Sequence, residues 1–525
     1  MGGTIADVLA ELRHRYPGAR DRGTAFELLV QRYLRTDPMY TEQFSRVWLW
    51  TEWPDRPPVA DTGIDLVAEV AGGGLCAVQC KCFDEDHQLQ KSDIDSFFTE
   101  SGKRPFTQRL IVSTTDRWSV HAEEALDGQQ VPVARIGLAD LAASAVDWSA
   151  FSLDQPDRMQ VHAKKHPLPH QEAAVADVMA GFEAHDRGRL VMACGTGKTF
   201  TALEIAERVA AERVAAGATG PAHVLFLVPS ISLLNQTLRE WTNEASLPMR
   251  CYAVCSDTNV GKRSGRAPSE DLRVHDLAFP ATTDGATLAG QVIRGGAGVE
   301  LVVIFSTYQS IGAVSAAQAA GVPELDLAIC DEAHRTTGVT LAGDDESAFV
   351  RVHDQQFLRA RRRLYMTATP RLFSATTKAQ AADADAVLCS MDDEALYGPE
   401  FHRLGFGRAV EAGLLSDYKV LVLNVDEDHV ARSLQAPLAD EHNELALDDA
   451  AKIVGCWNGL AKRGNLVLVG DGYGADPQPM RRAVAFSRSI KDSKLFTSRF
   501  AGIIGTYTAE HTGDQAGDDF LRCEV

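Results

Sequence analysis

The alternation of apolar and polar positions divides the chain into the strands and helices of an α/β protein. Residues 4–15 and 22–35 have the periodicity of amphipathic helices, and an aromatic strand at 47–50 follows them. Later apolar runs, such as 190–193 and 224–228, are short and continuous and lie between helical stretches. Such runs are typical of strands that are buried on both faces of a parallel sheet. The pattern therefore predicts an α/β chain with parallel strands in its larger part.

A glycine-rich hairpin lies between the first helices and the parallel strands. Its first strand ends at Glu69, the turn is Gly72–Gly74, and the chain returns through residues 75–82. The rest of this region reads as alternating helices and strands, with helices beginning at Lys91 and Ser119 and strands at 109–112 and 131–136. Residues 141–165 have no clear period and are expected to link two domains.

The parallel region contains a strand, a glycine turn and a helix in the order that binds phosphate. The apolar run 190–193 leads into Gly195-Thr196-Gly197-Lys198-Thr199, and helix-favouring residues follow. Backbone N–H groups and the positive end of the helix dipole would face an anion there. Lys198 would reach the β- and γ-phosphates and Thr199 would ligate Mg²⁺. Met192 stands where the complete motif has glycine, so an ordinary glycine turn shows the same local pattern.

Further strands place acidic and polar side chains beside this turn. The apolar run 325–330 ends in Asp331 and Glu332, followed by His334. A carboxylate at the end of a neighbouring parallel strand can position Mg²⁺, which suits Asp331, and Glu332 would orient or deprotonate the attacking water. Gln171 precedes the first helix of this region, where its carboxamide can read an adenine edge. We therefore predict an ATP site with bound Mg²⁺.

The glycine-rich hairpin gathers side chains of the kind that cut phosphodiester bonds. Asp65 lies on one strand, and Gln79 and Lys81 are two residues apart on the other, so they point to the same face. The acid and a backbone carbonyl can hold Mg²⁺, while the lysine positions water and offsets charge on the phosphorane. Glu27 lies beside the apolar face of the helix 22–35. A structural hairpin with a surface ion pair would show the same spacing.

These motifs resemble two known families. Gln171, the turn 195–199, Asp331-Glu332-Ala333-His334 and Thr367-Ala368-Thr369 are similar to the Q motif, motif I, the DEAH box and motif III of superfamily 2 helicases. The resemblance covers 165 to about 415. It implies that Gln171, Gly195, Thr196, Gly197, Lys198, Thr199, Asp331 and His334 bind ATP and Mg²⁺, that Glu332 is catalytic, and that the loops at Pro229-Ser230 and Ser306–Gln309 touch nucleic acid.

The hairpin resembles the Mrr-like branch of PD-(D/E)xK nucleases over roughly residues 20–140. In that branch a glutamine often replaces the second acid, as Gln79 does here, and a helix carries a further carboxylate, as Glu27 does. The resemblance implies that Asp65, Gln79, Lys81 and Glu27 are catalytic and that Asp65 binds Mg²⁺. A nuclease joined to such a motor resembles the Type ISP restriction enzymes.

The resemblance implies an α/β architecture of four parts. We expect a restriction-endonuclease-like nuclease domain at 1–145, a linker at 146–165, a first RecA-like lobe at 166–415 and a partial second RecA-like lobe at 416–525. The expected partner is double-stranded DNA, and a methyltransferase and target-recognition module is expected downstream in the chain or on a separate subunit. Neither methylation nor sequence recognition can be assigned to these 525 residues.

The bulk composition is that of an ordinary globular protein, with 45% hydrophobic and 24% charged residues. The net charge of −20 excludes wholesale electrostatic attraction to nucleic acid but permits a local basic groove. The ten cysteines form no C-x-x-C pair, which favours a reducing compartment. We find no export signal and no apolar run long enough to span a bilayer, and we expect a cytoplasmic protein without a membrane partner.

The last hundred residues raise two alternatives. A strand at 418–424 and a motif IV-like stretch at 482–489 are present, but nothing like motif V or the arginine-bearing motif VI follows, and Arg522 has no strand after it. We therefore expect the chain alone to bind ATP weakly, to hydrolyse it slowly with little stimulation by DNA, and to be protease-sensitive beyond about 416. The alternatives are a helicase or remodeller whose first domain only grips DNA, and a truncated ATP-binding remnant without turnover.

Overall fold

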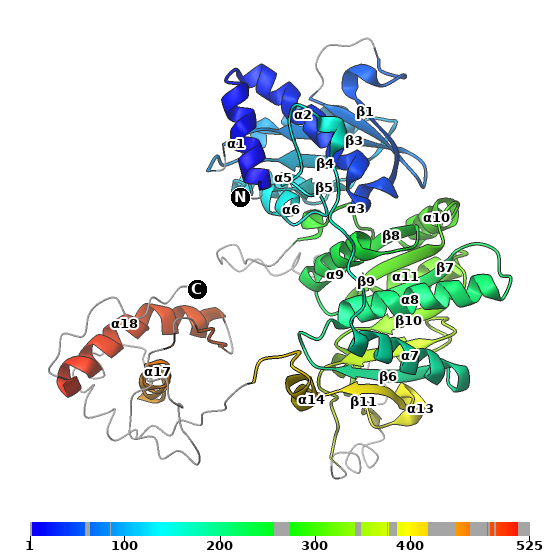
Figure 1. Ribbon diagram of the computed structural model, residues 1–525, viewed down its shortest axis with the longest axis vertical. Helices are drawn as coiled ribbons and strands as arrows, with labels where there is room; N and C mark the ends of the chain where they lie inside the picture. The colour runs from blue at the N-terminus through cyan, green and yellow to red at the C-terminus, as the bar shows by residue number, and fades with distance from the viewer. Residues whose placement is uncertain are drawn as a thin grey trace. The chain divides into compact units, whose positions relative to one another are not determined.

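The computed structural model describes residues 3–57, 63–84, 86–256, 273–341, 348–374, 376, 386–417, 447–461, 480, 483–487 and 490–512. The chain divides into two compact units, Met1–Ser416 and Asp417–Val525. The first unit contains two large sheets with their covering helices and a small two-stranded sheet (Figure 1). In the second unit, α17 (Leu447–Leu460) and α18 (Ile490–Thr512) contact each other through apolar residues that include Trp457 and Phe500.

The first sheet is the predicted hairpin extended on both sides, with strand order β1-β2-β3-β4-β5. The first three strands are antiparallel, and β4 and β5 run parallel to β3. The strands are β1 (Phe44–Leu49), β2 (Leu66–Val70), β3 (Leu75–Lys81), β4 (Phe106–Ser113) and β5 (Val133–Ile136).

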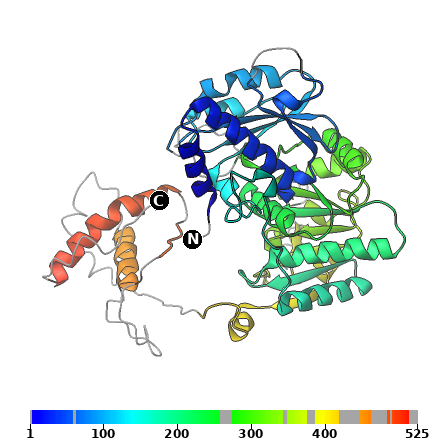
Figure 2. The ribbon, with the colours of Figure 1, turned by 45° about the horizontal axis from the view of Figure 1, so that its top comes forward.

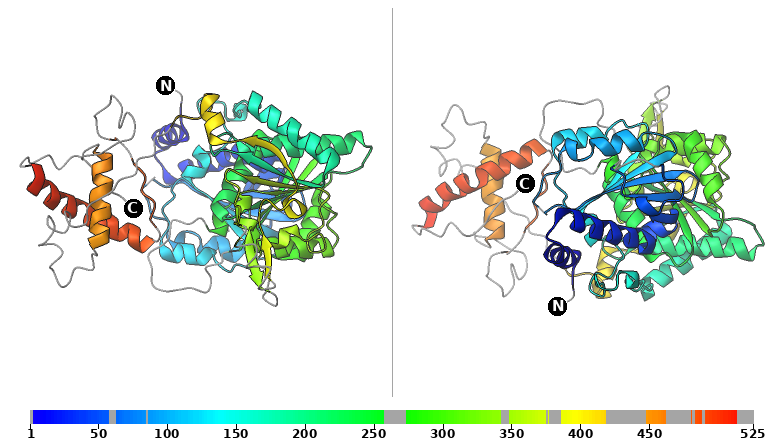
Figure 3. Two further views of the ribbon diagram at one scale, coloured as in Figure 1. Left: turned by 90° about the horizontal axis from the view of Figure 1, so that it is seen from below. Right: turned by 90° about the horizontal axis from the view of Figure 1, so that it is seen from above.

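Helices cover both faces of the first sheet, because its inner strands are apolar on both sides. On one face lie α1 (Ile5–Arg15) and α2 (Ala19–Thr36), and on the other α4 (Asp95–Ser101) and α5 (Val120–Leu126) (Figure 3). Residues of β3 alternate between these cores: Val78 packs on the α2 side and Ala77 on the α4 side. This alternation fixes where the neighbouring Gln79, Cys80 and Lys81 point.

The second sheet is parallel throughout, with strand order β14-β6-β12-β10-β7-β9-β8. This confirms the predicted α/β class with a parallel sheet. The strands are β6 (Arg187–Met192), β7 (Ala222–Val228), β8 (Met249–Val254), β9 (Leu301–Thr307), β10 (Leu327–Cys330), β12 (Arg363–Thr367) and β14 (Glu400–Leu404). A separate antiparallel pair is formed by β11 (Gly338–Leu341) and β13 (Ala386–Cys389).

Two helical layers enclose the parallel sheet. One consists of α7 (Pro169–Ala184), α8 (Lys198–Ala215) and α9 (Ile231–Glu244), and the other of α10 (Gly285–Gly295) and α11 (Ile311–Ala319). Short helices α13 (Glu394–Tyr397) and α14 (Phe406–Glu411) flank β14. In β9 the residues alternate strictly, with Val303 facing α9 and Ile304 facing α11.

The two sheets share one continuous core. The cluster that holds α1 and α2 on the first sheet continues through α3 (Pro38–Thr41) and α9 into the core of the second sheet (Figure 2). The stretch after α6 (Leu138–Ala142), predicted to be a linker, folds back on itself through an antiparallel bridge between Val146 and Val161. Its Trp148 side chain is only 5% exposed, so the first part of this connection is packed, whereas residues 160–166 are exposed.

Candidate active sites

The hairpin of the first sheet places Asp65 at the end of β3. The backbone N–H of Asp65 donates to Val78 O at 2.9 Å, and its carbonyl accepts from Trp50 N at 2.7 Å. Its carboxylate Oδ2 accepts a hydrogen bond from the backbone N of Cys80 at 2.6 Å. These three bonds hold the carboxylate against β3 between the positions of Gln79 and Lys81.

Gln79 is buried with one of its polar atoms unsatisfied. Its side chain is 1% exposed, and its Nε2 donates to Gly63 O at 3.1 Å. Its Oε1 has no hydrogen-bond partner among the described residues. A buried amide oxygen without a partner is costly, so an oxygen left in this state next to a carboxylate is a typical ligand position for a hard cation.

Gly63 allows the close approach that brings this amide into place. Its φ is +73°, and a Cβ on it would lie 2.8 Å from Ser96 Oγ and 3.2 Å from Phe97 N of α4. Any other residue would push α4 away from the start of β2. The sequence showed a glycine here but gave no sign that α4 lies against it.

Glu27 reaches the same strand end from the other face. Burial and the carboxylates of Asp65 and Glu27 raise the pKa of the Cys80 thiol well above its usual value, while Lys81 opposes the shift. These four residues therefore lie near one another. Since Cys80 points toward α2, Glu27 approaches from the α2 side, whereas Gln79 and Lys81 point to the α4 side.

Thr114 fixes the chain that leaves Lys81, a role that sequence reasoning missed. Its backbone N donates to Lys81 O at 3.0 Å. Its hydroxyl accepts from Phe83 N at 2.8 Å and donates to Phe83 O at 2.5 Å. The available signal in the sequence was the polar run Ser113-Thr114-Thr115, which begins at the last residue of the apolar strand β4. In the structure all three residues are fully buried.

The donor set of this hairpin fits a divalent cation. Among the described residues no three His, Cys, Asp or Glu side chains come together as a metal site. Carboxylate and amide oxygens are nevertheless the ligands that Mg²⁺ takes, and it keeps several waters beside one or two carboxylates. Asp65 and the unsatisfied Oε1 of Gln79 supply such oxygens.

The glycine turn of the second sheet has the backbone that the sequence predicted. Gly195 and Gly197 both have φ of +83°, and α8 begins directly after Gly197. A Cβ on Gly197 would collide with the Nε2 atom of Gln171. Met192, the departure from the complete motif, is the last residue of β6, and its side chain is fully buried in the core. The glycine is therefore not needed at that position.

The turn holds its lysine and threonines by backbone contacts. Lys198 Nζ donates to Met192 O at 3.3 Å and lies 3.9 Å from Cys194 Sγ. Thr196 is buried, and its hydroxyl donates to Ala193 O at 2.7 Å. The carbonyl of Thr199 accepts from Trp241 Nε1 at 3.0 Å, which ties the first turn of α8 to α9.

Gln171 lies against this turn rather than apart from it. Its Oε1 accepts from Leu168 N at 2.8 Å and caps α7, while its Nε2 donates to Gly197 O at 3.4 Å. His170 adds a contact between its Nε2 and Thr196 O at 2.9 Å. The start of α7 is thus tied to the phosphate turn, and the adenine-reading role of Gln171 stays a prediction.

Asp331 and Glu332 follow β10, at the same edge of the sheet as the turn after β6. Asp331 is 8% exposed. Burial, and then the neighbouring Glu332, raise the pKa of Asp331 to about 6, and Lys198 opposes this shift. A bound cation would relieve the same unfavourable charge, so the site also fits Mg²⁺.

His334 links Glu332 to β12, the strand that lies between β6 and β10. Glu332 has φ of +48°, the single positive value of a non-glycine residue in the described part of the chain, and such strain is typical of functional positions. His334 Nδ1 lies 3.3 Å from Glu332 Oε2 and 3.1 Å from Thr367 Oγ1 at the end of β12. Tyr308 belongs to the stretch Ser306–Gln309 that was predicted to touch nucleic acid, and its hydroxyl donates to Asp331 O at 2.8 Å.

The stretches predicted beyond residue 415 fall mostly outside the described residues. This holds for the strand at 418–424, for Arg482, Arg488 and Ser489 of the motif IV-like stretch, and for Arg522. In the described part of the chain, no helix is both long and apolar enough to span a membrane.

Comparison with known proteins matches two separate stretches of the chain to two families. A family model described as restriction endonuclease matches residues 35–158. A second model, described as Type III restriction enzyme, res subunit, matches residues 164–372. A comparison with curated proteins found no match.

Among solved structures, the chain is similar to the ATP-dependent Type ISP restriction-modification enzyme LlaBIII bound to DNA. The identity is 39% and the TM-score 0.78, over 96% of this chain and 31% of that one. It also matches a nuclease-deletion mutant of the Type ISP enzyme LlaGI in complex with a DNA substrate mimic, at 35% identity and a TM-score of 0.44, over 65% of this chain and 22% of that one. The chain therefore spans about a third or less of the enzymes it matches.

Proposed function

Since the chain belongs to the Type ISP restriction enzymes, of which it holds the nuclease and helicase parts, we propose that it is an ATP-dependent translocase on double-stranded DNA that also cuts DNA. It would act in restriction of foreign DNA, in the cytoplasm. A methyltransferase and target-recognition module, in the same polypeptide or on a separate subunit, would be its partner. The observation that carries the proposal is the hairpin with Asp65, Lys81 and the unsatisfied Gln79 oxygen in the same unit as the phosphate turn.

In the nuclease site, Asp65 and Gln79 would hold Mg²⁺, with Glu27 adding negative charge from the α2 side. When bound, the cation would activate water and offset charge on the phosphate. Lys81 would bind the phosphate next to the bond that is cut. The hydrogen bonds from Thr114 to the backbone of Lys81 and Phe83 fix the position of the Lys81 backbone at the end of β3.

In the motor site, the N–H groups of Gly195, Thr196 and Gly197 would cradle the phosphates of ATP. Lys198 would leave Met192 O and bind the β- and γ-phosphates, while Thr199 and Asp331 would hold Mg²⁺. Glu332 would orient the attacking water. His334 contacts both Glu332 and Thr367, so it would couple the position of Glu332 in this site to the end of β12. Gln171 would contact adenine.

Nicking of supercoiled DNA by the full chain in Mg²⁺ tests the nuclease half of the proposal. Lys81→Ala should lower the nicking rate by at least about a hundredfold, because removing one group that stabilises the transition state typically costs that much. The matched control is Lys103→Ala, which removes an exposed lysine paired with Glu100 at 2.7 Å in the same domain and should leave the rate unchanged. If Mg²⁺-dependent nicking is absent at high enzyme excess, or if Lys81→Ala nicks like the control, the first domain only grips DNA.

A further inference from the structure

Residues 273–284, which precede α10, dock the nuclease domain onto the motor. The sequence predicted only an excursion between strands at 256–298. In the structure, Leu277, Ala278 and Phe279 of this excursion are buried in the core shared by the two sheets. The chain then returns to the motor, where Thr282 N donates to Ala253 O at 3.0 Å.

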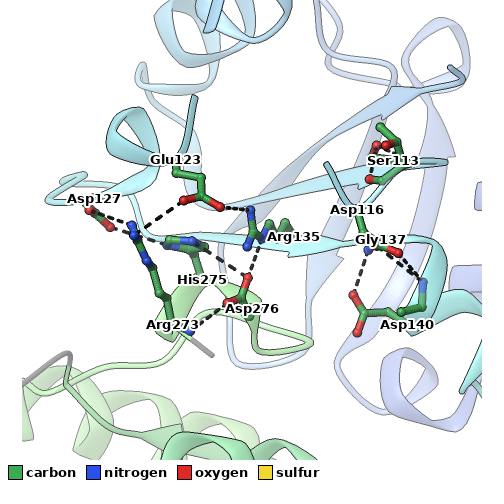
Figure 4. A network of polar contacts seen from close by, with 12 residues as sticks. Ser113, Asp116, Glu123, Asp127, Arg135, Gly137, Asp140, Arg273, His275 and Asp276 are labelled. Atoms are coloured by element: carbon green, nitrogen blue, oxygen red, sulfur yellow. Dashed lines mark hydrogen bonds and ion pairs between the residues drawn. The ribbon is translucent and has the colours of Figure 1, made fainter. Parts of the chain in front are cut away.

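Ahead of these apolar residues, the excursion presents charges that match those of the nuclease domain (Figure 4). Arg135 of β5 pairs with Asp276 through Nε and with Glu123 of α5 at 3.6 Å. Arg273 pairs with Glu123 and with Asp127 of α5, each at 3.6 Å. The side chains of Arg135 and Asp276 are 17% and 11% exposed.

His275 lies inside this network. It is 4% exposed and lies 3.6 Å from Asp127 and 3.9 Å from Asp276. Burial and the nearby Arg135 lower the pKa of His275 to about 4. The histidine is therefore neutral at ordinary pH, and the network between the domains consists of two arginines and three carboxylates.

A second junction lies on α9. Arg239 Nη2 contacts Asp140 Oδ1 of the nuclease domain at 2.5 Å, and both side chains are mostly buried, at 15% and 25% exposed. Beside it, Tyr40 of α3 donates to Ala278 O at 3.1 Å. The same helix α9 carries Trp241, whose Nε1 bonds Thr199 in the phosphate turn. Both junctions therefore belong to the body of the first motor lobe.

We propose that these two junctions hold the nuclease domain in one orientation on the first motor lobe, so that it cuts DNA at a fixed distance from the motor. Arg135, Arg273 and Arg239 are then positioning residues for cleavage. The fixed attachment does not depend on the proposed function, whereas the effect on the position of the cut rests on it.

The physical basis is that half-buried charges are tolerated only as pairs. Separating the domains would take Arg135 away from Asp276 and leave it with Glu123 alone, and it would expose Leu277 and Phe279 to water. Removing one partner of a buried, hydrogen-bonded charge pair is far more costly than removing both. The junction is therefore either closed with its pairs intact or open, with little room for intermediate orientations.

Hydrogen exchange of the full chain tests the attachment. Arg135→Met and Asp276→Asn each remove one charge while keeping bulk, and each should speed exchange of the amides at 133–137 and 273–279 by about tenfold or more. The double variant should exchange no faster than the more open single variant, because the two residues act on each other. The control is Arg104→Met, an exposed arginine at the opposite end of β4. Exchange like wild type in both single variants, or strictly additive effects, would overturn the attachment.

The position of cleavage is measured on linear DNA with a protein roadblock. The wild type should cut in a narrow window at a constant distance from the block. Arg135→Met and Asp276→Asn should widen this window while leaving the ATPase rate and the nicking rate of supercoiled DNA unchanged. The positioning role would be contradicted if these variants show fast hydrogen exchange at the junction but cut DNA in a window as narrow as that of the wild type. Loss of cutting in the wild type itself would instead count against the proposed function, and hydrogen exchange would still decide the attachment.

Discussion

At the scale of single residues, the most informative group is Asp331, because its environment disfavours its own charge. Its pKa is raised from 3.8 to about 6, first by burial and then by Glu332. The folded protein therefore holds a proton on Asp331 between about pH 4 and 6 that the unfolded chain has already lost. The ionised carboxylate thus lowers the stability of the folded state as pH rises through this window.

Asp331→Asn should remove this pH dependence. Without nucleotide, the variant should unfold at a higher temperature than wild type at pH 7.5, by the equivalent of about 1–3 kcal/mol, and the difference should shrink as the pH falls toward 4. Binding of ATP with Mg²⁺ should be lost in the same variant. Thermal unfolding of both proteins across this pH range checks the prediction, and a difference that stays constant with pH would contradict it.

The residues show what a single sequence can and cannot predict about a site. The phosphate turn, Asp331 and the hairpin residues were predicted because each lies within or directly beside a recognisable apolar strand. The structure alone shows that Gln79 Oε1 has no hydrogen-bond partner among the described residues, that Glu332 has positive φ and that Thr114 makes hydrogen bonds to the backbone of Phe83. These features depend on which strands lie side by side, and that information is absent from local periodicity.

At the scale of elements, the exit of β3 depends on β4 through Thr114. The hydroxyl of Thr114 makes two hydrogen bonds to the backbone of Phe83 and is fully buried. Thr114→Val keeps the shape of the side chain but leaves the N–H group of Phe83 without its partner, at a cost of about 1–3 kcal/mol. The C=O group of Phe83 loses one of its two hydrogen bonds and keeps the one from Arg13 Nη2 at 2.9 Å.

We therefore expect Thr114→Val to loosen the chain after Lys81. Mg²⁺-dependent nicking should fall by about tenfold or more, because a small displacement of a catalytic group costs that much, while ATP binding should be unchanged. Ser45→Ala is a suitable control, since it removes an exposed hydroxyl that bonds Glu69 away from the site. Nicking at the wild-type rate in Thr114→Val would show that Lys81 is not positioned through β4.

Helices and strands were predicted well where the periodicity of apolar residues was strong. They were predicted poorly where contacts with other parts of the fold determine the local structure. Both sheets contain the strands that the apolar runs indicated. The short helix α3 and the 3₁₀ turn at Val274–Asp276 were missed, because each has only three or four residues and is held by contacts with the other domain. The linker at 146–165 stays a prediction, to which the structure adds that Trp148, near its start, is packed into the core.

At the scale of the whole molecule, the account requires two active sites with separate chemistry on one unit. The unit Met1–Ser416 holds the nuclease hairpin and the phosphate turn on different sheets, joined by a shared core. No residue assigned to one site is assigned to the other. The two activities should therefore be separable by mutation although the domains are fixed to each other.

The most direct test is to measure ATP binding, ATP hydrolysis and Mg²⁺-dependent nicking of supercoiled DNA on the same preparations of wild type, Lys81→Ala and Glu332→Gln. Lys81→Ala should bind and hydrolyse ATP like wild type and lose nicking. Glu332→Gln should bind ATP and nick supercoiled DNA like wild type but lose hydrolysis, because it keeps the Mg²⁺ ligand Asp331 and removes the group that acts on water. Loss of the same activities in both variants would contradict the assignment of two separate sites.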